Sequence, residues 1–176
     1  MQFQKLNTEQ MNAKQHKVAR EICTKLASGI SGPYVSLFYS PDTAALVQRL
    51  DEYLRYGLRM PERLRILAVL VAAGQFSGED ILSFLQIEAP ADCGLSADVV
   101  NAIKNHDQPT DLKEDEALVY EFVSELANSG RVNDLLFERA RAMFDREVCL
   151  ELVKVSGFAI FIRNTMNATG QFFQRG

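Results

Sequence analysis

The sequence contains one cysteine and one histidine that are candidates for a nucleophile and its base. Cys93 precedes Gly94, and His106 lies in a polar loop over residues 105–111. A thiol becomes a useful nucleophile when a neighbouring base or positive charge favours its thiolate form. Nothing in the sequence places a base beside Cys93. A structural cysteine is therefore the preferred interpretation, and a Cys93–His106 pair is the alternative.

The other cysteines and histidines show no metal-site spacing. Cys23, Cys93 and Cys149 are far apart and form no CxxC, so neither a disulfide framework nor a four-thiolate zinc site is predicted. Only two histidines, His16 and His106, are present, and no HxxxH pattern occurs. We therefore expect no metal and no cofactor. His16 lies on a polar helix and is expected to face solvent.

Two arginines and two asparagines are candidate ligand contacts. Arg63 and Arg65 could hold a carboxylate through paired hydrogen bonds. They could equally pair with Glu62 or with an acid on a neighbouring subunit, and such structural pairing is preferred. Asn164 and Asn167 lie near the end of the final apolar helix, where a buried amide must find partners. Packing or capping contacts are preferred there, and ligand contact is the alternative.

The composition is that of one soluble folded domain. The chain has 176 residues, of which 47% are hydrophobic and 24% charged, which is too apolar for a disordered chain. The net charge of -4 makes sequence-blind binding of nucleic acid unexpected, because that binding needs a positive field. The first 12 residues are polar, and the longest apolar stretch, 148–162, contains Glu151 and Lys154. Neither a signal peptide nor a membrane span is predicted, and a cytoplasmic location is expected.

Helix-start and helix-stop signals recur along the whole chain. No segment alternates apolar and polar residues as a half-buried strand does. We therefore predict an all-α fold, one domain over residues 1–176, with about eight helices and a short turn at 34–39. The expected helices cover 8–28, 41–57, 61–73, 77–90, 97–105, 113–128, 133–144 and 145–170.

The helix expected at 61–73 is the best candidate for the centre of the core. Between residues 64 and 73 only Arg65 is polar, and a helix that is apolar all round is buried all round. The final helix is also largely apolar. One small core can scarcely cover two such helices, so a homo-oligomer is predicted.

The helix expected after Ser40 has a strong start signal and two distinct faces. The Ser40 hydroxyl is expected to accept a free backbone N–H of the first turn. One apolar face carries Ala45, Leu46, Leu50, Tyr53 and Leu54. The neighbouring Asp51 and Arg55 are interpreted as an ion pair on a solvated face.

Five short stretches occur in an order that is typical of one known family. The stretches are Gly32-Pro33-Tyr34 with Ser40-Pro41-Asp42; Tyr53-Leu54-Arg55-Tyr56; Pro61-Glu62-Arg63-Leu64-Arg65 with Leu67-Ala68-Val69-Leu70; Asp115-Glu116-Ala117-Leu118-Val119-Tyr120 with Ser129-Gly130-Arg131-Val132; and Glu151-Leu152-Val153 with Gly157-Phe158. The ordered set covers residues 32–170 and resembles the carboxymuconolactone decarboxylase family of the AhpD-like superfamily. The resemblance implies an all-helical AhpD-like domain that assembles into trimers, hexamers or similar rings, with sites near subunit contacts.

The same resemblance implies that the reactive residues of the family are missing. Family members usually carry a Glu just after the arginine of the central helix, where this chain has Ile66. The thiol-using branch carries CxxC and a His at the next helix start, but the matching residues 78–85 contain no Cys or His. The decarboxylase-like branch carries Glu-Trp and a His there, and this chain has no Trp. Peroxide reduction needs an activated thiolate, so thiol reductase activity is not expected.

Three residues of the segment 78–85 remain candidates for contact with a ligand. Glu79 and Asp80 are its only ionisable groups and could act as a base or bind a cation at a pocket mouth. The preferred interpretation is that they stabilise the positive end of a helix dipole. Phe84 is a candidate for apolar contact with a ligand.

Three functions stay open after the sequence is read. The first is an AhpD-like homo-oligomer of unknown specific activity that lacks the thiol chemistry and binds a small apolar or carboxylated ligand. The second is an active decarboxylase- or lyase-like enzyme that uses other residues. The third is a helix-turn-helix regulator, faintly suggested by residues 63–67 and 79–82. Acids on its reading helix would repel phosphate, so nucleic acid is not an expected partner.

Overall fold

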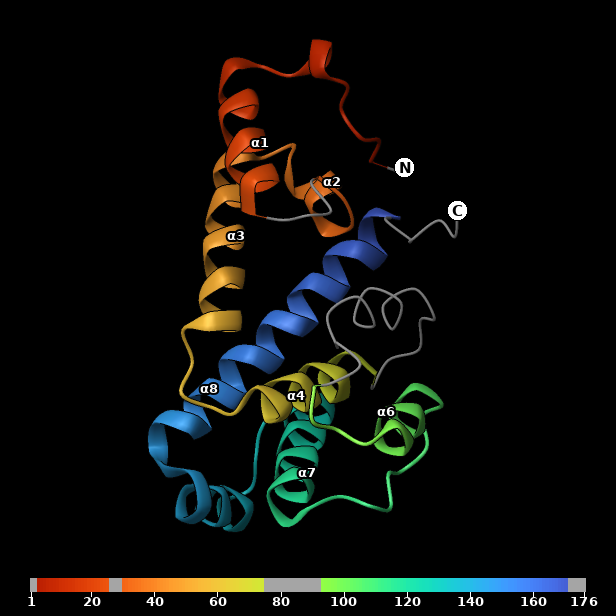
Figure 1. Cartoon of the computed structure of the whole chain (residues 1–176), viewed down its shortest axis with the longest axis vertical. Helices are drawn as coiled ribbons and strands as arrows, with labels where there is room; N and C mark the ends of the chain where they lie inside the picture. The colour runs from red at the N-terminus through yellow and green to blue at the C-terminus, as the bar shows by residue number, and fades with distance from the viewer. Residues whose placement is uncertain (1–2, 26–29, 75–92, 171–176) are drawn as a thin grey trace. The chain divides into compact units, whose positions relative to one another are not determined.

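The computed structural model describes residues 3–25, 30–74 and 93–170, and these ranges contain helices joined by loops, without a strand (Figure 1). This confirms the predicted all-α class. The segment predicted at 77–90, with Glu79, Asp80 and Phe84, lies outside the described residues. The described elements are the 3₁₀-helix η1 (Thr8–Gln10) and the α-helices α1 (Ala13–Lys25), α2 (Pro33–Leu37), α3 (Pro41–Tyr56), α4 (Glu62–Gly74), α6 (Ala97–Lys104), α7 (Glu114–Ser129) and α8 (Asp134–Thr169).

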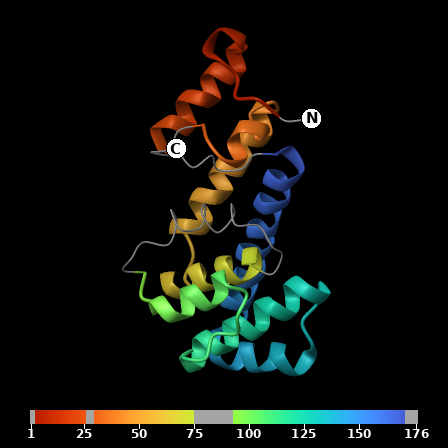
Figure 2. The same cartoon turned by 90° about the vertical axis from the view of Figure 1, so that its right-hand side faces the viewer.

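The described residues belong to two compact units. The first holds those of Met1–Gly57 and Ile162–Gly176, and the second holds those of Leu58–Phe161. In the first unit α3 packs against α1 and α2, and in the second α4 packs against α7 and α6. Figure 2 shows the same helices after a turn of 90°. None of the described helices is long and apolar enough to cross a membrane.

Helix α4 is the central element of the second unit, as the sequence predicts. Every residue from 64 to 74 is buried except Val69, which is half-buried. Arg65 is buried with the apolar residues, and its Nη2 lies 3.7 Å from Glu62 Oε1 one turn earlier. The unbroken apolar run therefore identifies the helix that the other elements of this unit surround.

Helix α3 buries only part of the apolar face that the sequence indicates, since Leu54 is buried and other members are exposed. Leu46, Leu50 and Tyr53 are 60%, 45% and 47% exposed. Asp51 is buried, with Oδ1 3.1 Å from Nε of Arg55, so the expectation of a solvated ion pair was wrong. The helix carries apolar residues on more than one side, and tertiary packing decides which side is covered. The buried apolar side chains of α3 are Ala44, Val47 and Leu54.

From α3 onward the described helices begin within one residue of the predicted starts, but the helix predicted over 8–28 is divided into η1 and α1, which begins at Ala13. One cap also differs in detail. α6 begins after Ser96, whose Oγ accepts a hydrogen bond from the N–H of Val99 at 3.2 Å. α3 begins after Ser40, but the Ser40 hydroxyl pairs with the Thr43 hydroxyl at 2.8 Å and accepts no backbone N–H. The expected Ser40 cap is therefore corrected. The Thr43 hydroxyl binds the Ser40 oxygen in place of the backbone N–H that was expected there.

Helix α8 bends at Asp145, where the sequence predicts that one helix ends and another begins. Asp145 has φ 67° and ψ 174°, and its Oδ1 accepts hydrogen bonds from the N–H groups of Glu147 (2.8 Å) and Val148 (3.1 Å). The bond from Val148 is the largest cause of a pKa of Asp145 below its ordinary value. Asp145 thus caps the second stretch of α8, and Figure 1 shows the change of direction.

A buried glutamate of α8 binds the backbone that leads into α4. Glu151 is 1% exposed, and its two oxygens accept the backbone N–H groups of Arg59 (3.0 Å) and Met60 (2.9 Å). These N–H groups precede the first turn of α4. A buried N–H without an acceptor is costly, so the carboxylate holds this stretch of backbone in place.

Replacing Glu151 by Ala should lower the free energy of unfolding by about 2–4 kcal/mol, because two N–H groups lose their acceptor. The matched control Glu147→Ala removes an exposed ion pair with Arg59 (2.5 Å) and should cost less than about 1 kcal/mol. Urea unfolding followed by circular dichroism measures both. Equal losses for the two variants would contradict the assigned role of Glu151.

Candidate functional site

A cleft lies in the second unit where α4 and α6 end. Its volume is about 280 Å³, just below the range of roughly 300–1,000 Å³ that is typical of ligand pockets. We call it the α6 cleft. The described residues that line it are Val71, Gly74, Ile103, His106, Asp107 and Tyr120.

The floor of the α6 cleft is apolar and closely packed. Val71 and Gly74 of α4 and Ile103 of α6 are all buried. A Cβ atom on Gly74 would lie 3.3 Å from Cγ2 of Ile103, so the glycine lets the two helices approach each other. Val71 and Ile103 are only 2% and 5% exposed, so the floor shapes the cleft and offers a ligand a small apolar contact.

The rim of the α6 cleft carries three polar side chains that no other described residue engages. His106 and Asp107 are exposed and Tyr120 is half-buried. Within the described ranges, no hydrogen bond or ion pair involves the imidazole, the carboxylate or the phenol of these residues. These groups are able to donate, accept or transfer protons. The rim can therefore orient a bound molecule.

His106 occupies a backbone position that glycine usually takes. Its φ is 61°, in the left-handed region. The N–H of His106 donates to the carbonyl of Ile103 (3.2 Å), and the N–H of Asp107 donates to that of Ala102 (2.8 Å), which is the Schellman pattern at a helix end. A residue with a Cβ in this conformation carries a backbone cost of order 1–2 kcal/mol. The imidazole is thus held at the rim at some expense in stability.

A second, larger cavity adjoins the α6 cleft through Tyr120. It has a volume of about 550 Å³ and lies along α7. Two carboxylates in its lining are already engaged. Glu121 pairs with Arg139 at 2.9 Å, and Glu125 accepts the N–H of Asn133 at 2.8 Å. These acids therefore serve the packing of α7 with α8.

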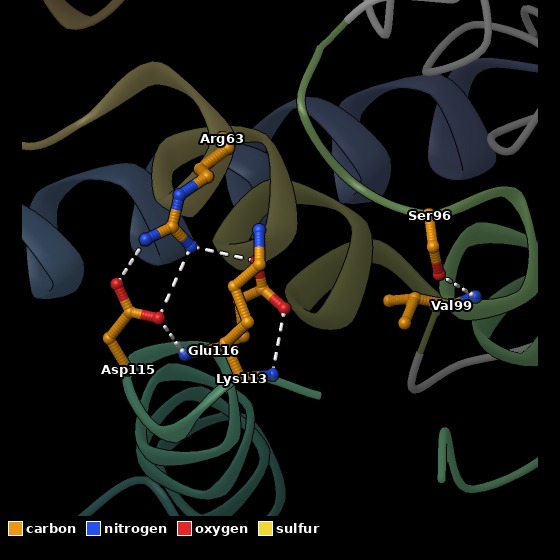
Figure 3. A network of polar contacts seen from close by, with 6 residues as sticks. All are labelled: Arg63, Ser96, Val99, Lys113, Asp115 and Glu116. Carbon is orange, nitrogen blue, oxygen red and sulfur yellow. Dashed lines mark hydrogen bonds and ion pairs between the residues drawn. The ribbon is translucent and has the colours of Figure 1, made fainter. Parts of the chain in front are cut away.

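Arg63, predicted as a ligand contact or a structural pair, is engaged within its own chain (Figure 3). Its Nη1 donates to Glu116 Oε1 at 2.7 Å and to Asp115 Oδ1 at 3.2 Å, while its Nη2 pairs with Asp115 Oδ2. Lys113 Nζ lies 3.5 Å from Glu116 Oε1. Arg63 thus joins the first turns of α4 and α7, and two carboxylates balance its charge.

This network shifts the pKa of its members. Burial acts to raise the pKa of Asp115, but the hydrogen bond and the charge of Arg63 outweigh it and hold that pKa below its ordinary value. The hydrogen bond with Asp115 is the largest cause that raises the pKa of Arg63. Both groups therefore stay charged at neutral pH.

The remaining predicted ligand contacts do not line the α6 cleft. Arg65 pairs with Glu62 of its own helix, which was the preferred interpretation. Asn164 and Asn167 are both exposed, so the expectation of buried amides there was wrong. Asn164 Oδ1 accepts hydrogen bonds from Nε (3.2 Å) and Nη2 (3.0 Å) of Arg163.

The thiols and the histidine that could have paired are not brought together. Cys93 is half-buried, does not line the α6 cleft and makes no hydrogen bond with His106. Cys149 is buried, and burial raises the pKa of its thiol. Cys23 is exposed and belongs to the first unit. The described residues contain no group of three or more potential metal ligands.

Sequence reasoning named His106 but missed its neighbours at the rim. Asp107 and Tyr120 come from different elements, and only the packing of α6 near α7 makes them part of one cleft. One local signal was available. Helices commonly end at a residue with a left-handed backbone, which is usually glycine. A histidine at such a helix end, with no glycine beside it, indicates a backbone position that costs stability.

Replacing Asp115 by Asn should flatten the acid side of the stability profile. The lowered pKa of Asp115 contributes stability above its unfolded value of about 3.9, and this stability is lost as the pH falls through the folded value. The wild-type free energy of unfolding should therefore drop below about pH 4. The variant should be less stable at pH 7 and change less between pH 7 and pH 3. Urea unfolding between pH 3 and pH 7 measures the free energy of unfolding of the wild type and the variant. An equal change with pH in the two proteins would contradict the assigned role of the Arg63–Asp115 pair.

Comparison with known proteins adds no relative to this picture. No protein-family model matches the chain, and no curated protein matches it either. The resemblance to the carboxymuconolactone decarboxylase family therefore rests on the quoted stretches of sequence. A functional assignment rests on the geometry of the described residues.

Proposed function

We propose that the chain is a homo-oligomeric helical protein of the carboxymuconolactone decarboxylase type that binds a small, largely apolar ligand in the α6 cleft. The observation that carries this proposal is the combination of a buried apolar floor with three unengaged polar side chains, His106, Asp107 and Tyr120. The three polar groups supply hydrogen bonds and orientation, and the apolar floor adds a smaller contact with the body of the ligand.

Contacts between the stretches that resemble the family support this type of protein. Arg63 lies in the third stretch, and its partners Asp115 and Glu116 lie in the fourth. Glu151 of the fifth stretch accepts the N–H groups directly before the third. The similar residues are thus the ones that join the helices of the second unit.

The charges near α4 favour a neutral ligand over a carboxylated one. Arg63 is balanced by Asp115 and Glu116, and Arg65 is paired with Glu62. Asp107 at the rim of the α6 cleft would repel a carboxylate. We therefore propose an uncharged ligand with an apolar body and a hydrogen-bonding head.

Thiol peroxidase chemistry is left out of the proposal for a physical reason. It needs an accessible thiolate of low pKa and a resolving thiol. Cys149 is buried with a raised pKa, and Cys93 is only half-exposed. Neither residue supports that reaction.

A lyase-like activity is a second candidate, favoured by the backbone of His106. His106 has a left-handed conformation and lines the same cleft as Tyr120. Strained residues of this kind cluster at functional sites, and imidazole is the side chain that most readily moves protons near neutral pH. In this proposal His106 takes a proton from a bound substrate and Tyr120 orients it.

Benzyl alcohol is a suitable probe, because it combines an apolar ring with one hydroxyl. In an NMR titration the amides of Gly74, Ile103 and His106 should shift most. His106→Asn should weaken binding about threefold to tenfold through the loss of one hydrogen bond. Asparagine tolerates the left-handed conformation, so the backbone is kept.

Asn101→Ala is the control for this titration, because Asn101 is exposed on α6 and does not line the α6 cleft. It should leave the affinity unchanged. The proposal is wrong if the shifts centre away from the α6 cleft, or if both variants lower affinity equally.

The exposed face of α8 supports the proposed self-association. Leu150, Val153 and Phe161 are exposed, and with Gly157 they repeat at helical spacing along the second stretch of α8. A Cβ atom on Gly157 would meet nothing within 4 Å, so a second helix can approach closely there. We propose a second copy of this chain as the occupant of this apolar stripe.

Leu150→Glu should shift the protein towards monomer, because it places a charge within the proposed contact. Asn101→Glu adds the same charge to an exposed position of α6 and should leave the assembly unchanged. Size-exclusion chromatography with light scattering measures the mass of each variant. A monomeric wild-type protein would rule out the self-association.

A further inference from the structure

A separate cavity lies in the first unit, beside α1. Its volume is about 390 Å³, within the range of ligand pockets. We call it the α1 pocket. The described lining residues that matter here are Lys5, Met11, His16, Arg20, Cys23 and Ile30. None of them takes part in the function proposed above.

The α1 pocket combines an apolar wall with a half-buried imidazole. Ile30 is buried and Met11 is half-buried, so a short hydrocarbon tail finds apolar contacts there. His16 was expected to face solvent, but it is half-buried and lines the pocket. Its ring adds a hydrogen-bonding group between the apolar wall and the charged rim.

The charged rim of the α1 pocket is cationic and unmatched. Lys5 and Arg20 are exposed, and neither makes an ion pair or hydrogen bond with another residue in the described part of the chain. No carboxylate is found among its described lining residues. Elsewhere on α1 a lysine is matched, since Lys14 Nζ lies 2.5 Å from Asp42 Oδ2. The two cations Lys5 and Arg20 therefore remain available to a ligand of the pocket.

The segment that carries Lys5 is anchored. The Tyr39 hydroxyl donates to the carbonyl of Gln4 at 2.9 Å. The ring of Phe3 meets that of Tyr39 edge-on at 5.0 Å between centroids, and the N–H of Phe3 donates to Thr169 at 3.4 Å. Lys5 thus follows directly on a fixed stretch of backbone, which lowers the entropy lost when it holds a ligand.

We propose that the α1 pocket binds a small anionic amphiphile, a molecule with one carboxylate head and a short hydrocarbon tail. Lys5 and Arg20 hold the head, and Ile30 and Met11 contact the tail. Arginine and lysine recognise carboxylates through charge-assisted hydrogen bonds. This site is separate from the one proposed in the α6 cleft, where the carboxylate of Asp107 would repel an anionic ligand.

Octanoate and octanol test the proposal, because they share a tail and differ in charge. Isothermal titration calorimetry should give octanoate about five- to tenfold higher affinity than octanol. Octanoate should also slow the alkylation of Cys23 by iodoacetamide, measured by peptide mass spectrometry in a Cys93→Ser background, because Cys23 lines the pocket and is exposed.

Two variants and one control locate the charge effect. Arg20→Gln and Lys5→Gln should each reduce the preference for octanoate, and the double variant should abolish it while octanol binding persists. Lys17→Gln is the control, since Lys17 is exposed on α1 and does not line the pocket. The proposal is overturned if neither probe binds, if the two bind equally to the wild type, or if Lys17→Gln acts like Arg20→Gln.

Discussion

The ion pair of Arg63 with Asp115 and Glu116 sets how α4 and α7 lie against each other. It joins the first turns of the two helices. One turn beyond Glu116, α7 brings Tyr120 to the α6 cleft, and about two turns beyond Arg63, α4 brings Val71 to its floor. The ion pair therefore fixes the relative positions of the residues of α4 and α7 that line the cleft. It also neutralises the charge with which Arg63 could have bound a carboxylate.

Features that depend on neighbouring residues were predictable from the sequence. The burial of α4 follows from its apolar run, and the start of α6 follows from the cap at Ser96. Features that depend on distant residues were not. α3 has apolar residues on several sides, so its sequence does not show that Leu46 is exposed and Asp51 buried. His106 could be named from its type alone, but its partners at the rim depend on packing.

The two proposed ligand sites differ in the charge at their rims. The α6 cleft has the carboxylate of Asp107, and the α1 pocket has the cations Lys5 and Arg20. In both, apolar residues form the wall and the polar groups at the rim have no partner among the described residues. Arg63, by contrast, is held in ion pairs by Asp115 and Glu116. A group held in this way stabilises the fold, whereas the groups at the two rims remain available to a ligand.

The most direct test of this account is a crystal structure of the protein soaked with phenol, a ring with a single hydroxyl. The account predicts phenol in the α6 cleft, with its ring on Val71 and Ile103 and its hydroxyl within hydrogen-bonding distance of His106 or Tyr120. Phenol bound beside Arg63 with the Asp115 pair opened, or an α6 cleft left without phenol while other sites are filled, would contradict it.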